Sequence, residues 1–106
     1  MTNNWEHVIL ASRMKIIGRS KLVSFSKKHQ DARKRISSWV VEVESACWKK
    51  PLDVKSKYPK ASLLSKNRVV FDMGGNYRLA ARVAYRNGIV EVLKIGTHDD
   101  YLRWKF

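Results

Sequence analysis

The chain has 106 residues, enough for one small domain, because a second hydrophobic core would have too few side chains to fill it. Hydrophobic residues make up 44% of it, which excludes a disordered segment, and no run reaches the roughly 18 to 20 apolar residues of a membrane span. Lys and Arg number 22 against nine Asp and Glu, so the net charge of +13 favours a polyanionic partner, with nucleic acid as the first candidate before an anionic membrane or an acidic protein.

The N-terminal part divides into an expected extension and the start of the domain. Residues 1–13 contain one Arg and one Glu, so removing them leaves the charge at +13, and we expect them to lie outside the fold. The domain is then expected to span residues 14–106. Lys15-Ile16-Ile17 follows Met14 and predicts a first strand. The single cysteine, Cys47, cannot form an internal disulfide, which favours the reducing cytoplasm as the location.

Two helices are predicted next. Ser20 is the expected N-cap of a short helix that has Leu22, Val23 and Phe25 on one side. Asp31 is the expected cap of a longer helix, which Pro51 ends. The longer helix carries one apolar stripe at spacings of three and four, made of Ala32, Ile36, Trp39, Val40, Val43 and Cys47. We therefore expect Cys47 to be a buried, small apolar residue without a nucleophilic role.

The segment 51–67 is predicted to be a long polar loop around Tyr58-Pro59, with Asp53 as its only acid. It carries the lysines Lys55, Lys57, Lys60 and Lys66. Because these side chains are exposed and positively charged, we expect them to act as phosphate anchors on RNA.

Three antiparallel strands complete the chain. Alternating apolar residues predict a strand over residues 68–73, a turn at Gly74-Gly75-Asn76 and a second strand that continues to Arg86. Asn87-Gly88 predicts a two-residue hairpin turn, followed by a strand over residues 89–96. A strand, two helices, a loop and three strands indicate an α+β fold whose antiparallel sheet is packed by two N-terminal helices.

A two-residue turn would fix the pairing of the last two strands. Arg82 then faces Leu93, and Arg78 faces Thr97. Glu91 would lie diagonally between Arg82 and Arg86, so these two arginines are expected to pair with it. Arg78 has no acid in register and is the arginine best placed to bind a phosphate. A bulge near Gly96 would turn His98 to the other face of the sheet.

Two sequence motifs resemble the HigB family of bacterial toxins. Residues 68–79 read RVVFDMGGNYRL, and residues 96–101 read GTHDDY after the hairpin; a Tyr58-Pro59-Lys60-Ala61 loop adds a weaker similarity. The resemblance implies a RelE-like β-α-α-β-β-β fold, ribosome-dependent cleavage of mRNA and neutralisation by a helix-turn-helix antitoxin protein. The acidic residue that often follows the tyrosine in this family is Leu102 here, which leaves a role for that position in doubt.

Metal-free cleavage of RNA needs a base for the 2′ proton, an acid for the leaving 5′ oxygen and positive charge at the phosphate. On the resemblance, Arg78, His98 and Tyr101 are the expected catalytic residues, and a lysine such as Lys66 is an alternative acid or base. The expected RNA-binding residues are Lys55, Lys57, Lys60, Lys66, Arg68, Asn76 and Arg82. No cofactor is expected, and no metal site is expected, because His7 and His29 do not combine with Cys47 at a ligand spacing.

Other readings of the same residues stay open. His98 is also suited to a structural role at a strand end, Tyr101 to packing against the sheet, and Asn76 to a turn that needs positive φ. At the level of function, the alternatives are a non-catalytic, basic RNA- or ribosome-binding module and a decayed toxin that is kept only as the antitoxin's partner. The RelE-like group also includes gyrase poisons, so the fold by itself does not give the activity.

Overall fold

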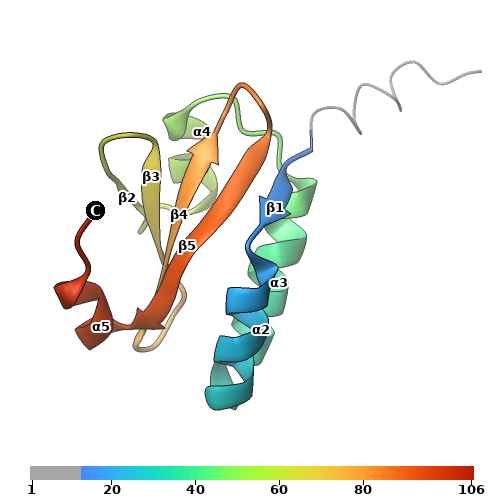
Figure 1. Cartoon of the computed structure of the whole chain (residues 1–106). Coiled ribbons are helices and arrows are strands. Elements are labelled where there is room, and N and C mark those ends of the chain that lie inside the picture. Colours follow the sequence, from blue (N-terminus) through green and yellow to red (C-terminus); the bar gives the residue numbers. More distant parts are fainter. Residues whose placement is uncertain (1–12) are drawn as a thin grey trace, which may run out of the picture.

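The structure is a computed structural model that describes residues 13–106. The expected extension falls almost wholly on residues 1–12, outside the described residues. The elements in chain order are β1 (Lys15–Ile17), α2 (Arg19–Lys28), the 3₁₀ turn η1 (Gln30–Ala32), α3 (Arg33–Ser45), α4 (Pro51–Lys57), β2 (Ser62–Leu63), β3 (Arg68–Asp72), β4 (Tyr77–Ala84), β5 (Ile89–Thr97) and α5 (His98–Arg103) (Figure 1).

The five strands form one mixed sheet in the order β1-β5-β4-β3-β2, which confirms the α+β class. Strands β3, β4 and β5 pair antiparallel as expected, and β2, which was not expected, pairs antiparallel with β3. Strand β1 pairs parallel with β5 through Lys15 and Ile89. The expectation of a wholly antiparallel sheet is therefore corrected at β1. A parallel pair needs a long crossover between its strands, and the rest of the domain supplies that connection here.

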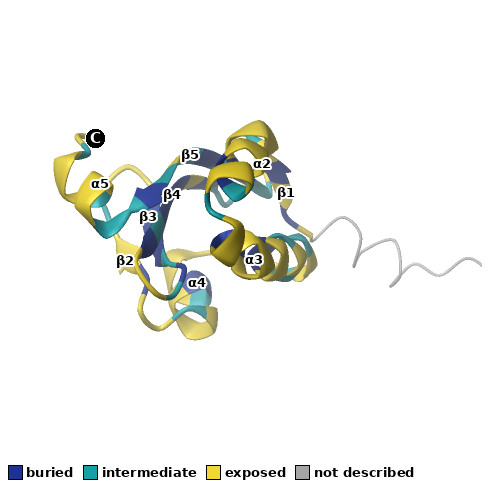
Figure 2. Cartoon of the chain, turned by 90° about the horizontal axis from the view of Figure 1, so that it is seen from below, coloured by how far each residue is buried: buried dark blue, intermediate teal, exposed yellow. Residues whose placement is uncertain are grey.

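The core lies between the sheet and the helices α2, α3 and α4. Its fully buried side chains include Trp39 and Val43 of α3, Val54 of α4, and Phe71 and Leu79 of the sheet. The buried residues follow the sides of α2, α3 and α4 that are turned toward the sheet (Figure 2). Helix α5 lies on the other face, away from α2 and α3 (Figure 1). The two faces of the sheet therefore have different roles: one carries the core, and the other is partly open.

The first two helices begin at residues other than those expected. Gly18, at φ 90°, precedes the first turn of α2 in place of Ser20, and Val23 is 55% exposed whereas Leu22 and Phe25 are buried. Asp31 makes no cap for α3. Its carboxylate instead accepts a hydrogen bond of 2.7 Å from the hydroxyl of Tyr77, which joins the α2–α3 corner to β4.

The end of α3 and the following loop also differ from the sequence prediction. Helix α3 ends at Ser45, so Cys47 no longer follows the helical stripe and is exposed, contrary to expectation. Pro51 begins α4 within the segment that was expected to be a loop, because proline is well suited to the first turn of a helix. The carboxylate of Asp53 accepts from the backbone N–H groups of Lys49 and Lys50 and stabilises that turn.

The last hairpin has a wider loop than Asn87-Gly88 predicts. Ala84 pairs with Ile89, so residues 85–88 all lie in the loop, and the two-residue turn was wrong. Tyr85 packs against the core cluster, which holds it out of the ladder. A bulge at Leu93 then shifts the register, and Arg78 pairs with Gly96 where Thr97 was expected. The bulge expected near Gly96 therefore lies earlier in β5.

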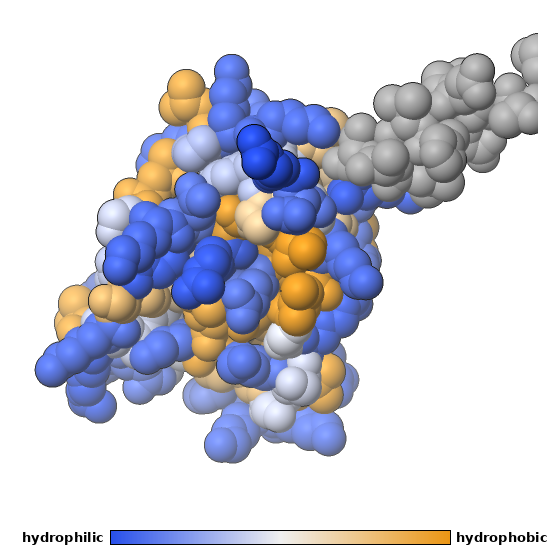
Figure 3. All heavy atoms as spheres, turned by 45° about the horizontal axis from the view of Figure 1, so that its top comes forward, coloured by the Kyte–Doolittle hydropathy of each residue, from blue (hydrophilic) through white to orange (hydrophobic). Residues whose placement is uncertain are grey.

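The surface is mostly polar. Hydrophilic side chains cover much of the face drawn in Figure 3, with an apolar area in its middle and smaller apolar areas along one side. Within residues 13–106, no helix combines the length and the hydropathy that crossing a bilayer requires. The chain has a net charge of +13, so many of its polar side chains are cations that a polyanionic partner can contact.

Candidate functional site

A small pocket of about 190 Å³ lies on the open face of the sheet, beside α5. It is lined by Lys60, Ser62, Val70, Asp72, Arg78, His98 and Tyr101. The three residues expected to be catalytic therefore line one pocket, together with one of the four lysines from segment 51–67. We call this hollow the catalytic pocket, after the role that the sequence predicts for these residues.

Helix α5 presents His98 and Tyr101 to the catalytic pocket. Thr97 caps the helix: its hydroxyl accepts from the N–H of Asp100 at 3.1 Å, and its own N–H donates to the Asp100 carboxylate at 3.0 Å. The backbone N–H of Thr97 and, after it, the Thr97 side chain hold the pKa of the Asp100 carboxyl below its ordinary value. His98 is the first residue of α5, and Tyr101 follows one turn later with its ring centroid 6.0 Å from that of His98.

A backbone bond joins α5 to the turn between β3 and β4. The N–H of His98 donates to the carbonyl oxygen of Asn76 at 2.7 Å. Asn76 thus contributes to the placement of His98 through its main chain, whereas the sequence predicted a side-chain contact with RNA. That side-chain contact stays a prediction.

Gly96 lets α5 lie close to the sheet next to Arg78. A Cβ at this position would come within 2.7 Å of the Asp100 Oδ2 atom and 3.1 Å of the Trp104 ring, too close for any side chain to fit without movement. Gly96 pairs with Arg78 across the sheet. The glycine therefore allows the helix that carries His98 and Tyr101 to approach the guanidinium.

Arg78 is held by two neighbours on its own side of the sheet. Its Nη1 atom donates to the carbonyl oxygen of Tyr77 at 2.9 Å and lies 3.4 Å from Oδ1 of Asp72. The same carboxylate oxygen accepts from the N–H of Gly74 at 2.9 Å. The expectation that Arg78 has no acid partner is therefore wrong. All of its hydrogen bonds in the described part of the chain use Nη1, which leaves Nη2 and Nε available to a phosphate.

Asp72, Ser62 and Val70 line the catalytic pocket and were missed in the sequence. The alternation of inward and outward side chains along β3 could have indicated Val70 and Asp72. Because Val69 and Phe71 point into the core, Val70 and Asp72 have to point to the opposite face, where Arg78 lies. Ser62 belongs to β2, which the sequence did not predict.

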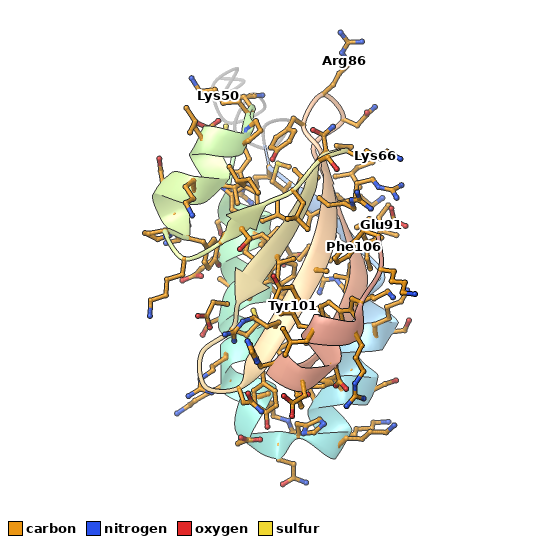
Figure 4. The ribbon with its side chains drawn as sticks, turned by 90° about the vertical axis from the view of Figure 1, so that its left-hand side faces the viewer. Lys50, Lys66, Arg86, Glu91, Tyr101 and Phe106 are labelled. Atoms are coloured by element: carbon orange, nitrogen blue, oxygen red, sulfur yellow. The ribbon has the colours of Figure 1, made fainter. Side chains whose placement is uncertain are left out.

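Lys60 is the cation of segment 51–67 that reaches the catalytic pocket. Lys55 donates to the carbonyl oxygen of Ala61, and Lys57 lies 3.9 Å from Glu42. Lys66 has a left-handed backbone at φ 60° and does not line the catalytic pocket. Lys66 and Arg86 lie toward one end of the sheet and Tyr101 toward the other (Figure 4). These positions disfavour Lys66 as the acid or base. Lys60 lines the catalytic pocket and is therefore the better candidate for that role.

Two arginines outside the catalytic pocket have partners in the protein. Arg82 lies 3.9 Å from Glu91, as expected for that pair, although the two residues face each other directly across the strands. Arg68 donates to Ser65, and its guanidinium lies 5.1 Å from the centre of the Phe106 ring. Both side chains remain at least partly exposed, and their contact with RNA stays a prediction.

Aromatic rings of the C-terminal tail continue from the catalytic pocket. The ring of Trp104 lies 5.8 Å from that of Tyr101, and the ring of Phe106 lies 6.4 Å from that of Trp104. Edge-to-face contacts of this kind stabilise the packing of the C-terminal tail against α5. Among residues 13–106, no group of three or more His, Cys, Asp or Glu side chains is arranged to hold a metal ion.

Comparison with known families gives one match. The sequence model of a family described as HigB_toxin, RelE-like toxic component of a toxin-antitoxin system, matches residues 32–104. This range covers more than half of the chain and includes α3, the catalytic pocket and both sequence motifs. No curated protein matches the chain.

Proposed function

Because the chain belongs to the HigB family of RelE-like toxins of toxin-antitoxin systems, we propose that it cleaves mRNA on the ribosome and thereby inhibits translation. The observation that carries this proposal is the catalytic pocket, where a guanidinium, an imidazole, a phenol and an ammonium group surround a space large enough for a phosphate. Metal-free cleavage of RNA requires groups of these kinds, because it needs a base, an acid and positive charge at the phosphate.

In the proposed reaction, the 2′ oxygen of a ribose attacks the adjacent phosphorus atom, and the bond from phosphorus to the 5′ oxygen breaks. The products are a 2′,3′-cyclic phosphate and a 5′ hydroxyl, so no water is consumed. His98 accepts the 2′ proton, because imidazole exchanges protons near neutral pH. Tyr101 or Lys60 gives a proton to the leaving 5′ oxygen. Arg78 binds the non-bridging oxygens, where negative charge grows in the transition state.

Asp72 and Gly96 support this arrangement without touching the substrate. Asp72 fixes the guanidinium of Arg78 through Nη1, so that Nη2 and Nε can face the phosphate. Gly96 brings α5 down beside Arg78. Such preorganisation matters because a misplacement of about 1 Å can cost about a hundredfold in rate.

The family implies an antitoxin as the partner of this toxin. We propose that the antitoxin contains a helix-turn-helix, and that the toxin acts in the cytoplasm on translating ribosomes. The charge of +13 supports binding to ribosomal RNA, since each neutralised phosphate releases counterions and strengthens binding at low salt. This attraction supplies the location on the ribosome, and the catalytic pocket supplies the chemistry.

Expression in bacteria, followed by primer extension on cellular mRNA, tests the proposal. We expect growth arrest and new mRNA ends with the unaltered protein, and neither with Arg78→Ala or His98→Ala. Arg86→Ala is the matched control, because Arg86 is an exposed arginine on the hairpin loop, away from Tyr101 (Figure 4). Uncut mRNA on ribosomes that carry the folded protein would support the non-catalytic binding module instead.

A further inference from the structure

The catalytic pocket adjoins two further hollows, the second of which lies between α3 and the C-terminal end of α4. An intermediate hollow of about 240 Å³ shares Lys60 and Asp72 with the catalytic pocket. The next hollow, of about 390 Å³, shares Tyr58 and Asp72 with the intermediate one. We call this last hollow the α3–α4 groove, and its α3 wall consists of Lys34, Arg35, Ser38, Trp39 and Glu42. The three hollows are therefore neighbours, and together they extend from the catalytic pocket to α3.

The chemistry of the groove suits a nucleotide better than a free phosphate. Lys34 and Arg35 provide positive charge, but the carboxylates of Glu42 and Asp72 line the same hollow and repel a bare anion. A nucleotide carries a phosphate for the cations and, on most bases, an amino group for the Glu42 carboxylate, whereas Asp72 is held by Arg78. Glu42 also accepts a hydrogen bond from Tyr58, whose pKa is raised by burial and by that carboxylate, so Tyr58 stays a donor.

Arg35 connects the groove with the catalytic pocket. Its guanidinium lies against the turn before β4, where a Cβ on Gly75 would come within 2.9 Å of Nη1 and a Cβ on Gly74 within 3.1 Å of Nε. The next residue of that turn, Asn76, accepts the bond from His98. Because Gly74 and Gly75 have no side chains, the guanidinium of Arg35 can lie beside the turn that positions α5.

Trp39 supplies a second observation. Its side chain lines the groove and is 2% exposed, yet its indole N–H has no hydrogen-bond acceptor among the described residues. A buried donor without a partner costs free energy that an arriving acceptor can restore. Nucleobases and ribose both offer such acceptors.

We infer that the α3–α4 groove binds a nucleotide of the mRNA that flanks the cleavage site. The inference rests on the proposed function and extends it, because it names α3 as part of the RNA-binding surface. Neither α3 nor Trp39 belongs to the motifs from which the activity was inferred.

Binding of a single-stranded RNA of six nucleotides tests the groove without any cleavage, if the His98→Ala variant is used throughout. We expect Lys34→Ala in this background to weaken binding roughly fivefold and to reduce the dependence of the affinity on salt, because one phosphate contact is lost. Arg33→Ala is the matched control. Arg33 is the neighbouring exposed cation of α3, but it lines the separate groove between α2 and α3. Equal losses for the two variants would overturn the inference.

The indole N–H of Trp39 gives a direct readout. Its signal in a ¹H–¹⁵N spectrum is identified by its absence in Trp39→Phe, and we expect it to shift when the six-nucleotide RNA binds. Trp39→Phe removes an unpartnered donor but leaves a small cavity in the core, so the affinity is measured at a temperature where the variant is folded, and there it should weaken RNA binding. An unmoved indole signal, or unchanged affinity in a folded Trp39→Phe protein, would overturn the inference. Cleavage by the unaltered toxin would still stand, so the two failures are distinguishable.

Discussion

The substitution Gly96→Ala tests how the catalytic pocket is built. Gly96 does not have positive φ, so alanine meets no backbone strain there. Its new Cβ would instead lie 2.7 Å from Asp100 Oδ2, 2.9 Å from Asp100 Cβ and 3.1 Å from the Trp104 ring. Helix α5 has to move outward by several tenths of an ångström or more, and the overpacking costs about 1–3 kcal/mol of stability. Because His98 and Tyr101 move with the helix, we expect cleavage to fall about a hundredfold.

Two measurements separate the loss of activity from the loss of stability. Urea unfolding, followed by tryptophan fluorescence, gives the stability, and the rate of mRNA cleavage on purified ribosomes gives the activity at a temperature where the variant is folded. Gly88→Ala is the matched control. Its Cβ would meet only the carbonyl oxygen of Arg13 at 3.4 Å, but φ is +67°, so it should also lose about 1–2 kcal/mol. Gly88 lies in the hairpin loop, and its variant should retain full cleavage. Full activity in Gly96→Ala would refute the reasoning.

Three further predictions follow from the same contacts. Arg78→Lys keeps the charge but loses the planar fork, so cleavage should fall about a hundredfold in the ribosome assay, and a change below threefold would count against Arg78 as the phosphate ligand. Asp72→Asn should lower the maximal cleavage rate about tenfold without changing the toxin concentration that gives half the rate, because it only positions Arg78; equal changes in both would contradict this. Thr97 holds the pKa of Asp100 below 3.8 in the fold, so the unfolded chain takes up the proton first, and stability is lost as the pH falls below about 4 and through the lowered pKa; urea midpoints should show a smaller loss for Asp100→Asn.

The order of elements could be read from the sequence because hydrophobic periodicity reports which residues are buried. The first strand, both N-terminal helices and the three last strands are all present in the expected order, although α3 and β4 end earlier than the pattern indicates. The short elements escaped prediction for a physical reason. Helix α4 has seven residues and buries only Val54, and β2 has two residues, so neither leaves a periodic signal.

The pairing of the last two strands could not be read from the turn alone. The dipeptide Asn87-Gly88 favours a two-residue turn, but the loop has four residues, and the first of them, Tyr85, packs against the core cluster. The bulge at Leu93 then moves the register by one residue toward the expected pairing. The register of the last two strands therefore differs from the one that the local turn preference predicts.

The candidate site was partly within reach of the sequence. Arg78, His98 and Tyr101 were chosen from two motifs, and they line one pocket. Asp72 and Lys60 also line it, but their proximity to Arg78 depends on the turn of β3 into β4 and on the path of the chain after α4. The catalytic roles of all these residues stay predictions.

The chemistry of the RNA ends tests the central claim most directly. Purified ribosomes programmed with a defined mRNA are treated with the toxin, and the fragments are analysed by mass spectrometry. Attack by the 2′ oxygen predicts a 2′,3′-cyclic phosphate or its hydrolysed 2′- or 3′-phosphate on one fragment and a 5′ hydroxyl on the other, with no fragments when His98→Ala replaces the toxin. Fragments with a 3′ hydroxyl and a 5′ phosphate, or undiminished cleavage by His98→Ala, would contradict the account.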